Sequence, residues 1–173
     1  ARNVLMKNGI KVVANNYASS NVDMPTMPLD ILSVFSNDNS VVVFDVGGDD
    51  DGALALGQYK QYFDKYGYEM HFIVNTKRPL TRTNDELIEI AERIESASRL
   101  KFTDIYNNTN LSDQTDETTL FSGYDEIKML SKKMGIVIKK NCGIDKALSN
   151  VPTNLKDTVF RMNICILRPW EIQ

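Results

Sequence analysis

Apolar residues follow two alternating patterns along this chain, short continuous runs and helical spacing. A continuous apolar run bounded by glycine or polar turns predicts a strand buried in a parallel sheet. A run of this kind, or a strand-like composition, marks the expected strands: Lys11–Ala14, Val41–Val46, Met70–Val74, Phe102–Tyr106, Ile136–Lys139 and Val159–Leu167. Val41–Val46 is the expected central strand, and Val159–Leu167 is expected at a sheet edge.

Apolar residues at helical spacing predict helices between these strands. The expected helices are Ala1–Asn8, Pro28–Phe35, Ala53–Tyr66, Asp85–Ser98, Tyr124–Lys133 and Asp145–Leu148. Asp85–Ser98 is the clearest of them, because Thr83 and Glu86 form a capping-box pair at its start. Gly9 and Gly135 stand where a glycine ends a helix.

Strands that alternate with helices predict an α/β fold, a three-layer sandwich whose mostly parallel central sheet is covered by helices on both faces. A chain of 173 residues fits one domain, so we expect residues 1–173 to form a single α/β domain. The first helix has no N-cap, which predicts that the sequence is a portion of a longer protein.

Composition narrows the class of protein. A net charge of −3 does not indicate a nucleic-acid surface driven by bulk charge. No apolar stretch approaches membrane-spanning length, and no signal-peptide pattern is present. Cys142 and Cys165 lack metal-ligand spacing, so we interpret both as buried apolar residues and expect a reducing, cytoplasmic location.

The sequence VVVFDVGGDDDG, which begins at Val41, carries the main candidate site. Asp45 ends the expected central strand, at the sheet edge where α/β proteins bind ligands. Proteins hold Mg²⁺ through one or two carboxylates, so Asp45 and Asp49 are candidate metal ligands. Alternatively, Asp45 caps a turn and the later carboxylates favour the dipole of the helix that follows.

The glycine pair in this sequence is the second candidate feature. Gly47 and Gly48 can take positive φ and let a ligand approach the backbone closely. Gly48 could then offer its backbone N–H to a terminal phosphate.

Polar residues also follow the next two expected strands. Asn107 and Asn108 follow Phe102–Tyr106, and an asparagine can both donate to and accept from a purine base. Alternatively they form an asparagine-rich turn. Met70–Val74 is followed by Asn75, Thr76, Lys77 and Arg78, whose two cations could attract a phosphate or simply face solvent.

Taken together, VVVFDVGGDDDG, FIVNTKRPLT and IYNNTNL in this order resemble the ParA/MinD-type (SIMIBI) P-loop ATPases, most closely a bacterial branch with a GGDD segment after the Walker B strand. The resemblance implies that Asp45 is the Walker B aspartate, which holds Mg²⁺ through water. It also implies that Gly48 meets the γ-phosphate of ATP and that Asn107 contacts the base. A homodimer closing over the nucleotide and a client protein are further implications.

The sequence departs from that family in one respect. No G-x-x-x-x-G-K-[ST] sequence occurs in it, although that loop and its lysine hold the β- and γ-phosphates. We therefore expect this sequence to be the part of a P-loop NTPase that follows the P-loop and second strand. The N-terminal strand, P-loop and helix of the fold are then absent from it. ATP–Mg²⁺ binding and hydrolysis are expected only with that missing segment.

Two other classes of protein remain open. The first is a non-catalytic α/β module that uses the sheet edge for protein contacts. The second is an S-adenosylmethionine methyltransferase, because D-V-G-G also resembles the nucleotide-binding turn of those enzymes. The sequence identifies no catalytic residue, since the one histidine, His71, has no evident nucleophile or orienting partner.

Overall fold

A computed structural model describes residues 2–13, 31–35 and 40–165, and the chain divides into two compact units. Unit 1 comprises Ala1–Tyr68, Ala97–Arg99 and Ile164–Gln173. Unit 2 comprises Glu69–Ser96 and Leu100–Asn163. Each unit is described on its own below, and the single domain stays a prediction.

Unit 2 is built on a four-stranded parallel sheet in the order β1-β2-β3-β4. Its strands are β1 (His71–Val74), β2 (Asp104–Asn107), β3 (Val137–Gly143) and β4 (Val159–Arg161). Its α-helices are α5 (Asn84–Ser98, whose last two residues belong to unit 1), α6 (Glu117–Phe121) and α7 (Tyr124–Met134). Its 3-10 helices are Ser112–Gln114, Asp145–Leu148 and Thr153–Thr158.

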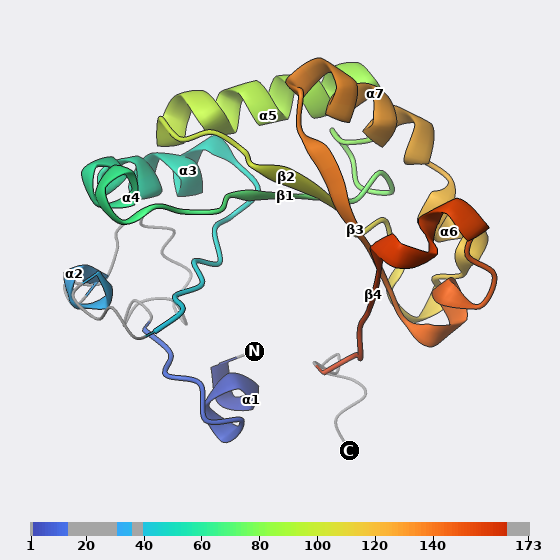
Figure 1. Ribbon diagram of the computed structural model, residues 1–173, viewed down its shortest axis with the longest axis horizontal. Helices are drawn as coiled ribbons and strands as arrows, with labels where there is room; N and C mark the ends of the chain where they lie inside the picture. Colours follow the sequence, from blue (N-terminus) through green and yellow to red (C-terminus); the bar gives the residue numbers. More distant parts are fainter. Residues whose placement is uncertain (1, 14–30, 36–39, 166–173) are drawn as a thin grey trace. The chain divides into compact units, whose positions relative to one another are not determined.

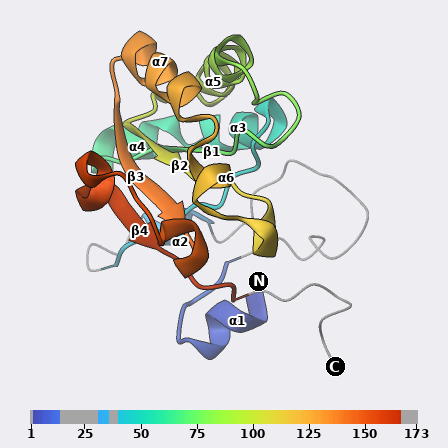
Figure 2. The same cartoon turned by 90° about the vertical axis from the view of Figure 1, so that its right-hand side faces the viewer.

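Helices α5 and α7 lie side by side on one face of this sheet (Figures 1 and 2). Each connects two neighbouring parallel strands, and both connections step across the sheet in the same direction. Right-handed crossovers that step in one direction place their helices on one face. Apolar residues of α5, β2 and α7 form the core between them: Leu87, Ile105, Ile127 and Leu130, all fully buried.

The other face of the sheet has a different character. In β1, Phe72 and Val74 are buried, whereas His71 and Ile73 are exposed. The α/β class and the parallel sheet are thus confirmed. Helices α5 and α7 lie on one face of the sheet, and the three-layer arrangement and the P-loop NTPase identity stay predictions.

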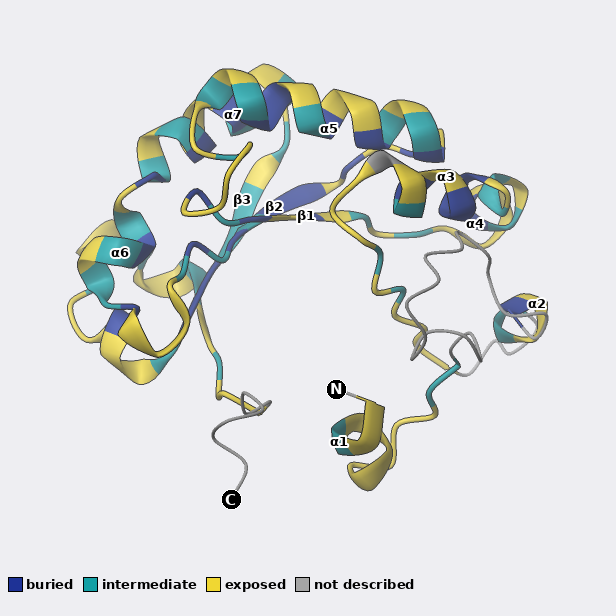
Figure 3. Cartoon of the chain, turned by 180° about the vertical axis from the view of Figure 1, so that it is seen from behind, coloured by how far each residue is buried: buried dark blue, intermediate teal, exposed yellow. Residues whose placement is uncertain are grey.

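Several elements of unit 2 were predicted correctly. Figure 3 shows β2 buried along most of its length, as expected for an inner strand. The capping box of α5 is present, because Glu86 N–H donates to Thr83 Oγ1 (3.3 Å) and Thr83 N–H donates to Glu86 Oε2 (3.0 Å). Gly135 ends α7 with a φ of 70°. These signals are local in sequence, which explains why they could be recognised.

The described part of unit 1 contains four short helices and an aromatic cluster. The helices are α1 (Arg2–Lys7), α2 (Ile31–Val34), α3 (Asp50–Gly57) and α4 (Lys60–Tyr66). The ring of Phe35 lies 5.0–6.4 Å from five other rings: Phe44, Tyr59, Tyr62, Phe63 and Tyr66. Aromatic packing of this kind stabilises the described part of unit 1.

The predicted central strand Val41–Val46 is wrong. This segment is not assigned to a strand, and Val41 and Val43 are 94% and 85% exposed. Its valines have strand composition, but a strand also needs a hydrogen-bonded neighbour, and none pairs with it in the described residues. Lys11–Val13 likewise form no strand, and Ala14 lies outside the described residues.

Three smaller predictions also need correction. The helix expected over Ala53–Tyr66 is two helices, α3 and α4, separated by a turn at Gln58 and Tyr59. The helix expected from Pro28 is α2 where it is described, and its first residues lie outside the described part. Cys142 is buried as expected, but Cys165 is exposed. None of the described helices is both long and apolar enough to cross a bilayer.

Candidate functional site

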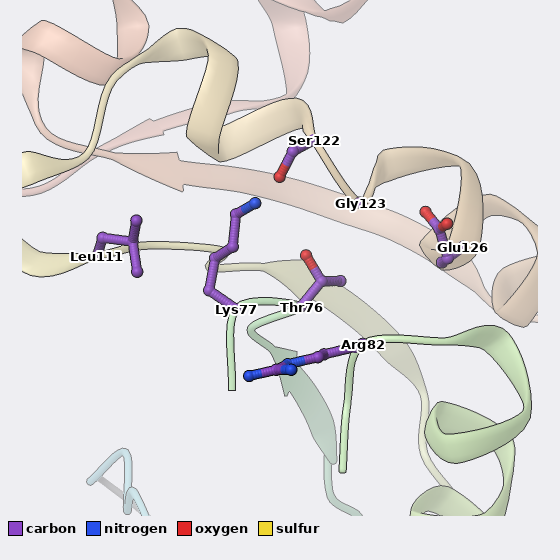
Figure 4. A pocket seen from close by; sticks show the side chains of 7 residues that line it. All are labelled: Thr76, Lys77, Arg82, Leu111, Ser122, Gly123 and Glu126. Carbon is purple, nitrogen blue, oxygen red and sulfur yellow. The ribbon is translucent and has the colours of Figure 1, made fainter. Parts of the chain in front are cut away.

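A pocket of about 340 Å³ lies where strands β1 and β2 end in unit 2 (Figure 4). Three segments form it: the loop after β1, the chain after β2 and the start of α7. The lining residues are Thr76, Lys77, Arg82, Leu111, Ser122, Gly123 and Glu126. The pocket lies at the carboxyl edge of a parallel sheet, the edge where ligands bind in open α/β folds.

The loop that carries Lys77 and Arg82 is held by hydrogen bonds of the Asn75 side chain. Its Oδ1 accepts from the N–H groups of Lys77 (3.0 Å) and Asn110 (3.2 Å), and its Nδ2 donates to Asn110 O (3.1 Å). Thr81 Oγ1 closes the loop by donating to Asn75 O (2.7 Å). Leu80 takes a φ of 65°, which is unfavourable for a leucine. Lys77 and Arg82 are therefore presented by an ordered loop.

The pocket has an excess of positive charge. In Figure 4 the ammonium of Lys77 points toward Ser122. Within the described residues, neither Lys77 nor Arg82 makes a side-chain hydrogen bond or ion pair. Arg82 contributes to lowering the pKa of Glu86, although the main cause is the hydrogen bond from Thr83 N–H. With the Glu126 carboxylate included, the lining carries two positive charges and one negative charge.

The N-terminus of α7 forms another wall of the pocket. Gly123 is its N-cap and provides no side chain to bond the first N–H groups of the helix. Such N–H groups attract anions, and the helix dipole adds to the attraction. Asp125 and Glu126 in the first turn oppose it, but Asp125 is paired with Lys128 at 2.5 Å. The wall thus combines backbone donors with one unpaired carboxylate, that of Glu126.

A close contact fixes α7 against the end of β1. A Cβ added to Gly123 would lie 2.2 Å from Thr76 Oγ1 and 2.5 Å from Thr76 Cβ. Thr76 is buried, its N–H donates to Thr109 Oγ1 (3.2 Å), and the two hydroxyl oxygens are 3.3 Å apart. Only glycine lets α7 begin this close to the pocket.

Asn107, a predicted base-contacting residue, lies in a buried polar network. Its Nδ2 donates to Leu120 O (3.1 Å) and Asn141 Oδ1 (3.0 Å), and its Oδ1 accepts from Thr109 N–H (3.1 Å). Asn141 Nδ2 in turn donates to Thr158 Oγ1 (2.8 Å). Asn107 is fully buried, so its visible role is to join β2, β3 and α6. A contact with a base stays a prediction.

Asn108 behaves differently from its neighbour. Its N–H donates to Val74 O (2.8 Å), which continues the pairing between the ends of β1 and β2. Its side-chain oxygen is buried and lacks a hydrogen-bond partner in the described structure. A buried acceptor without a donor is unfavourable by about 1–3 kcal/mol, so a ligand donor there would be stabilising.

The acidic glycine segment lies in unit 1. Asp45 is exposed and does not end a strand. Asp49 is the N-cap of α3, and its Oδ1 accepts from Gly52 N–H at 3.0 Å. Asp49 thus lies at the start of a helix, where the alternative interpretation placed the carboxylates that follow Asp45. Mg²⁺ binding by Asp45 and Asp49 stays a prediction.

The glycine pair does not take the conformation expected of it. Gly47 and Gly48 are exposed, and neither has a positive φ. Beside Gly48 an added Cβ would meet no atom within 4 Å, and beside Gly47 it would meet only Asp49, at 3.3 Å. The structure itself therefore does not require glycine at Gly48, and a phosphate contact there stays a prediction.

The sequence indicated part of the pocket. Lys77 was a candidate because it follows an expected strand, and it lines the pocket, whereas the other candidate cation, Arg78, does not. Arg82 lies in the same loop, directly before the capping box of α5, and could have been noticed by the same rule. Ser122 and Gly123 could not, because only the tertiary structure brings the start of α7 to the end of β1.

Comparison with models of known protein families, with curated proteins and with solved structures found no match to this chain. A function is therefore proposed from the pocket and not from a relative.

Proposed function

We propose that this protein binds a phosphorylated small molecule, a nucleotide, with its phosphate groups in the pocket at the carboxyl edge of β1 and β2. The observation that carries the proposal is the convergence of Lys77, Arg82 and the uncapped N-terminus of α7 on one pocket. Each of these features favours an anion, and they come from separate segments.

Charge and size support a phosphate ligand. The pocket lining has a net charge of about +1, and a phosphate group would add enough negative charge to balance it. The volume of about 340 Å³ is at the lower end of the usual range for small-molecule sites. A pocket of this size would hold the phosphate groups, and the rest of the ligand would lie outside it on neighbouring residues.

The nucleotide part of the proposal is supported by Asn108. Asn108 follows β2 directly at the same sheet edge, and its side-chain oxygen has no partner in the described structure. It is buried and does not line the pocket, so it would accept a hydrogen bond from a base amino group only if the side chain turned outward. The resemblance of the sequence to ParA/MinD-type ATPases adds ATP as the nucleotide and Mg²⁺ as its ion. Hydrolysis is expected only together with a P-loop, which this sequence does not contain, and no residue of the pocket is assigned a catalytic role in it.

A specific observation favours a second candidate, a non-catalytic interaction module. Val41 and Val43 are almost fully exposed in a segment of strand composition. Exposed apolar runs of this kind are suited to pairing with another protein. The second candidate predicts that no nucleotide binds in the pocket, so the experiment below separates the two.

Titration calorimetry with ATP, ADP, AMP and inorganic phosphate, with and without MgCl₂, tests the proposal. Lys77→Ala and Arg82→Ala are each expected to weaken nucleotide binding by roughly tenfold or more, because a charge-assisted hydrogen bond contributes about 1.5–3 kcal/mol. Binding should also weaken as salt is raised.

Lys132→Ala is the matched control. It removes an exposed lysine of α7 that does not line the pocket. Its affinity should equal that of the parent. Equal affinities for Lys77→Ala, Arg82→Ala and Lys132→Ala, or no binding by the parent, would refute the proposal.

A further inference from the structure

A histidine and two carboxylates gather at the opposite, amino edge of the sheet in unit 2. His71 is the first residue of β1 and Asp104 the first of β2, and the parallel register pairs them directly. Glu69 precedes β1. One ligand atom from each of the three lies within 4.8 Å of the others. The pocket described above involves none of these residues.

The buried carboxylate fixes the orientation of the imidazole. The side chain of Asp104 is 6% exposed, and its Oδ1 lies 2.5 Å from His71 Nδ1. An ionised carboxylate can only accept, so Nδ1 carries the hydrogen. The ring of His71 also packs against Tyr106, with centroids 4.8 Å apart. In the neutral form, which zinc binding requires, Nε2 carries the lone pair and faces outward.

The outward nitrogen faces a second carboxylate. His71 Nε2 lies 3.7 Å from Glu69 Oε2. Two ligands of a tetrahedral zinc ion are separated by about 3.4 Å, given metal–ligand distances near 2.1 Å. Both side chains are accessible, with 35% of His71 and 65% of Glu69 exposed, so they can close this small difference. A histidine whose other nitrogen donates to a buried carboxylate is also the usual arrangement around bound zinc.

Lys139 is the competing group. The register of β2 and β3 shifts between Ile105 and Tyr106, so Lys139 is the extra residue of a bulge. Its Nζ donates to Glu69 Oε2 (2.7 Å) and Asp104 Oδ2 (3.3 Å). The Lys139 ammonium balances one of the two carboxylates, those of Glu69 and Asp104. One negative charge therefore remains when His71 is neutral. A cation is thus favoured between Nε2 and Glu69.

We propose that His71 Nε2 and the Glu69 carboxylate bind a zinc ion at the amino edge of the sheet, with Asp104 orienting the imidazole. The mixed nitrogen and oxygen donors favour Zn²⁺ over Mg²⁺, which prefers oxygen ligands. Zinc displaces Lys139 from Glu69, while Lys139 keeps its contact with Asp104. The site is independent of the nucleotide pocket.

The sequence has one histidine, so its imidazole signals report on this site alone. The full chain, as Cys165→Ser to remove the exposed thiol, is titrated with ZnCl₂ and followed by NMR of the His71 ring. Cys142 is buried, and burial raises the pKa of its thiol to about 11, which disfavours zinc binding there. We expect a saturable shift of the ring signals at one equivalent, and no shift with MgCl₂.

Glu69→Gln should weaken zinc binding by roughly tenfold or more, and Asp104→Asn by a similar factor. Glu89→Gln, an exposed change on α5, is the matched control and should leave the affinity unchanged. Lys139→Gln should increase the affinity, because it removes the competing ammonium. Ring signals that do not move in excess zinc, or an unchanged affinity in Glu69→Gln, would overturn the proposal.

Discussion

Replacing Asn107 with alanine is expected to lower the free energy of unfolding by about 4 kcal/mol, because buried groups left without partners cost about 1–3 kcal/mol each. The change removes the donor to Leu120 O and Asn141 Oδ1 and the acceptor for Thr109 N–H. Asn107 is fully buried, so water cannot replace these bonds. Urea unfolding followed by circular dichroism measures the effect.

Asn108→Ala is the matched control, because it makes the same change one residue later. The side-chain oxygen of Asn108 has no partner to lose in the described structure, so we expect an effect below about 1 kcal/mol. The two variants also separate the roles of the adjacent asparagines. Asn108→Ala should weaken nucleotide binding while the protein stays folded. Equal stabilities for the two variants would contradict the assigned network.

Gly123→Ala is expected to destabilise the protein by about 3 kcal/mol, at the upper end of the usual cost of overpacking. The added Cβ would overlap Thr76. Thr76 Cβ is bonded directly to Cα, so no change of side-chain rotamer can move it away. The loop after β1 or the start of α7 must therefore move. The melting temperature should fall by about 10 °C. Nucleotide binding should weaken too, because the overlap lies in the pocket.

Gly48→Ala is the matched control for this substitution. An added Cβ there meets no atom within 4 Å and the φ of Gly48 is not positive, so stability should change by less than about 0.5 kcal/mol. Combining Gly123→Ala with Thr76→Gly should recover part of the loss, since the overlapping atoms are removed. A melting temperature for Gly123→Ala equal to that of Gly48→Ala would show that the contact is not tight.

Local signals explain what could be predicted of the fold. Helix α5 has a capping box and regular apolar spacing, and β1 is a short apolar run between turns, so both were recognised. Val41–Val46 has the same composition as a buried strand and is not one. The difference is the presence of a neighbouring strand, which depends on distant residues and not on the run itself.

In the candidate site, too, local signals could be predicted from the sequence and contacts between distant residues could not. Lys77 follows a strand, and the rule for parallel sheets places it at the ligand-binding edge. The role of Asn107 could not be predicted, because its partner Asn141 is 34 residues away in sequence. The cluster of Glu69, His71 and Asp104 was also missed, since the register of β1 and β2 brings it together.

The most direct test of the proposed nucleotide site is a map of backbone amide shifts in ¹⁵N-labelled protein as ATP is added. We expect the largest shifts on the loop Thr76–Arg82 and on Ser122–Glu126 at the start of α7. We also expect inorganic phosphate to shift the same amides. Shifts confined to Gly47–Gly52, or the absence of saturable shifts, would contradict the assignment of this pocket.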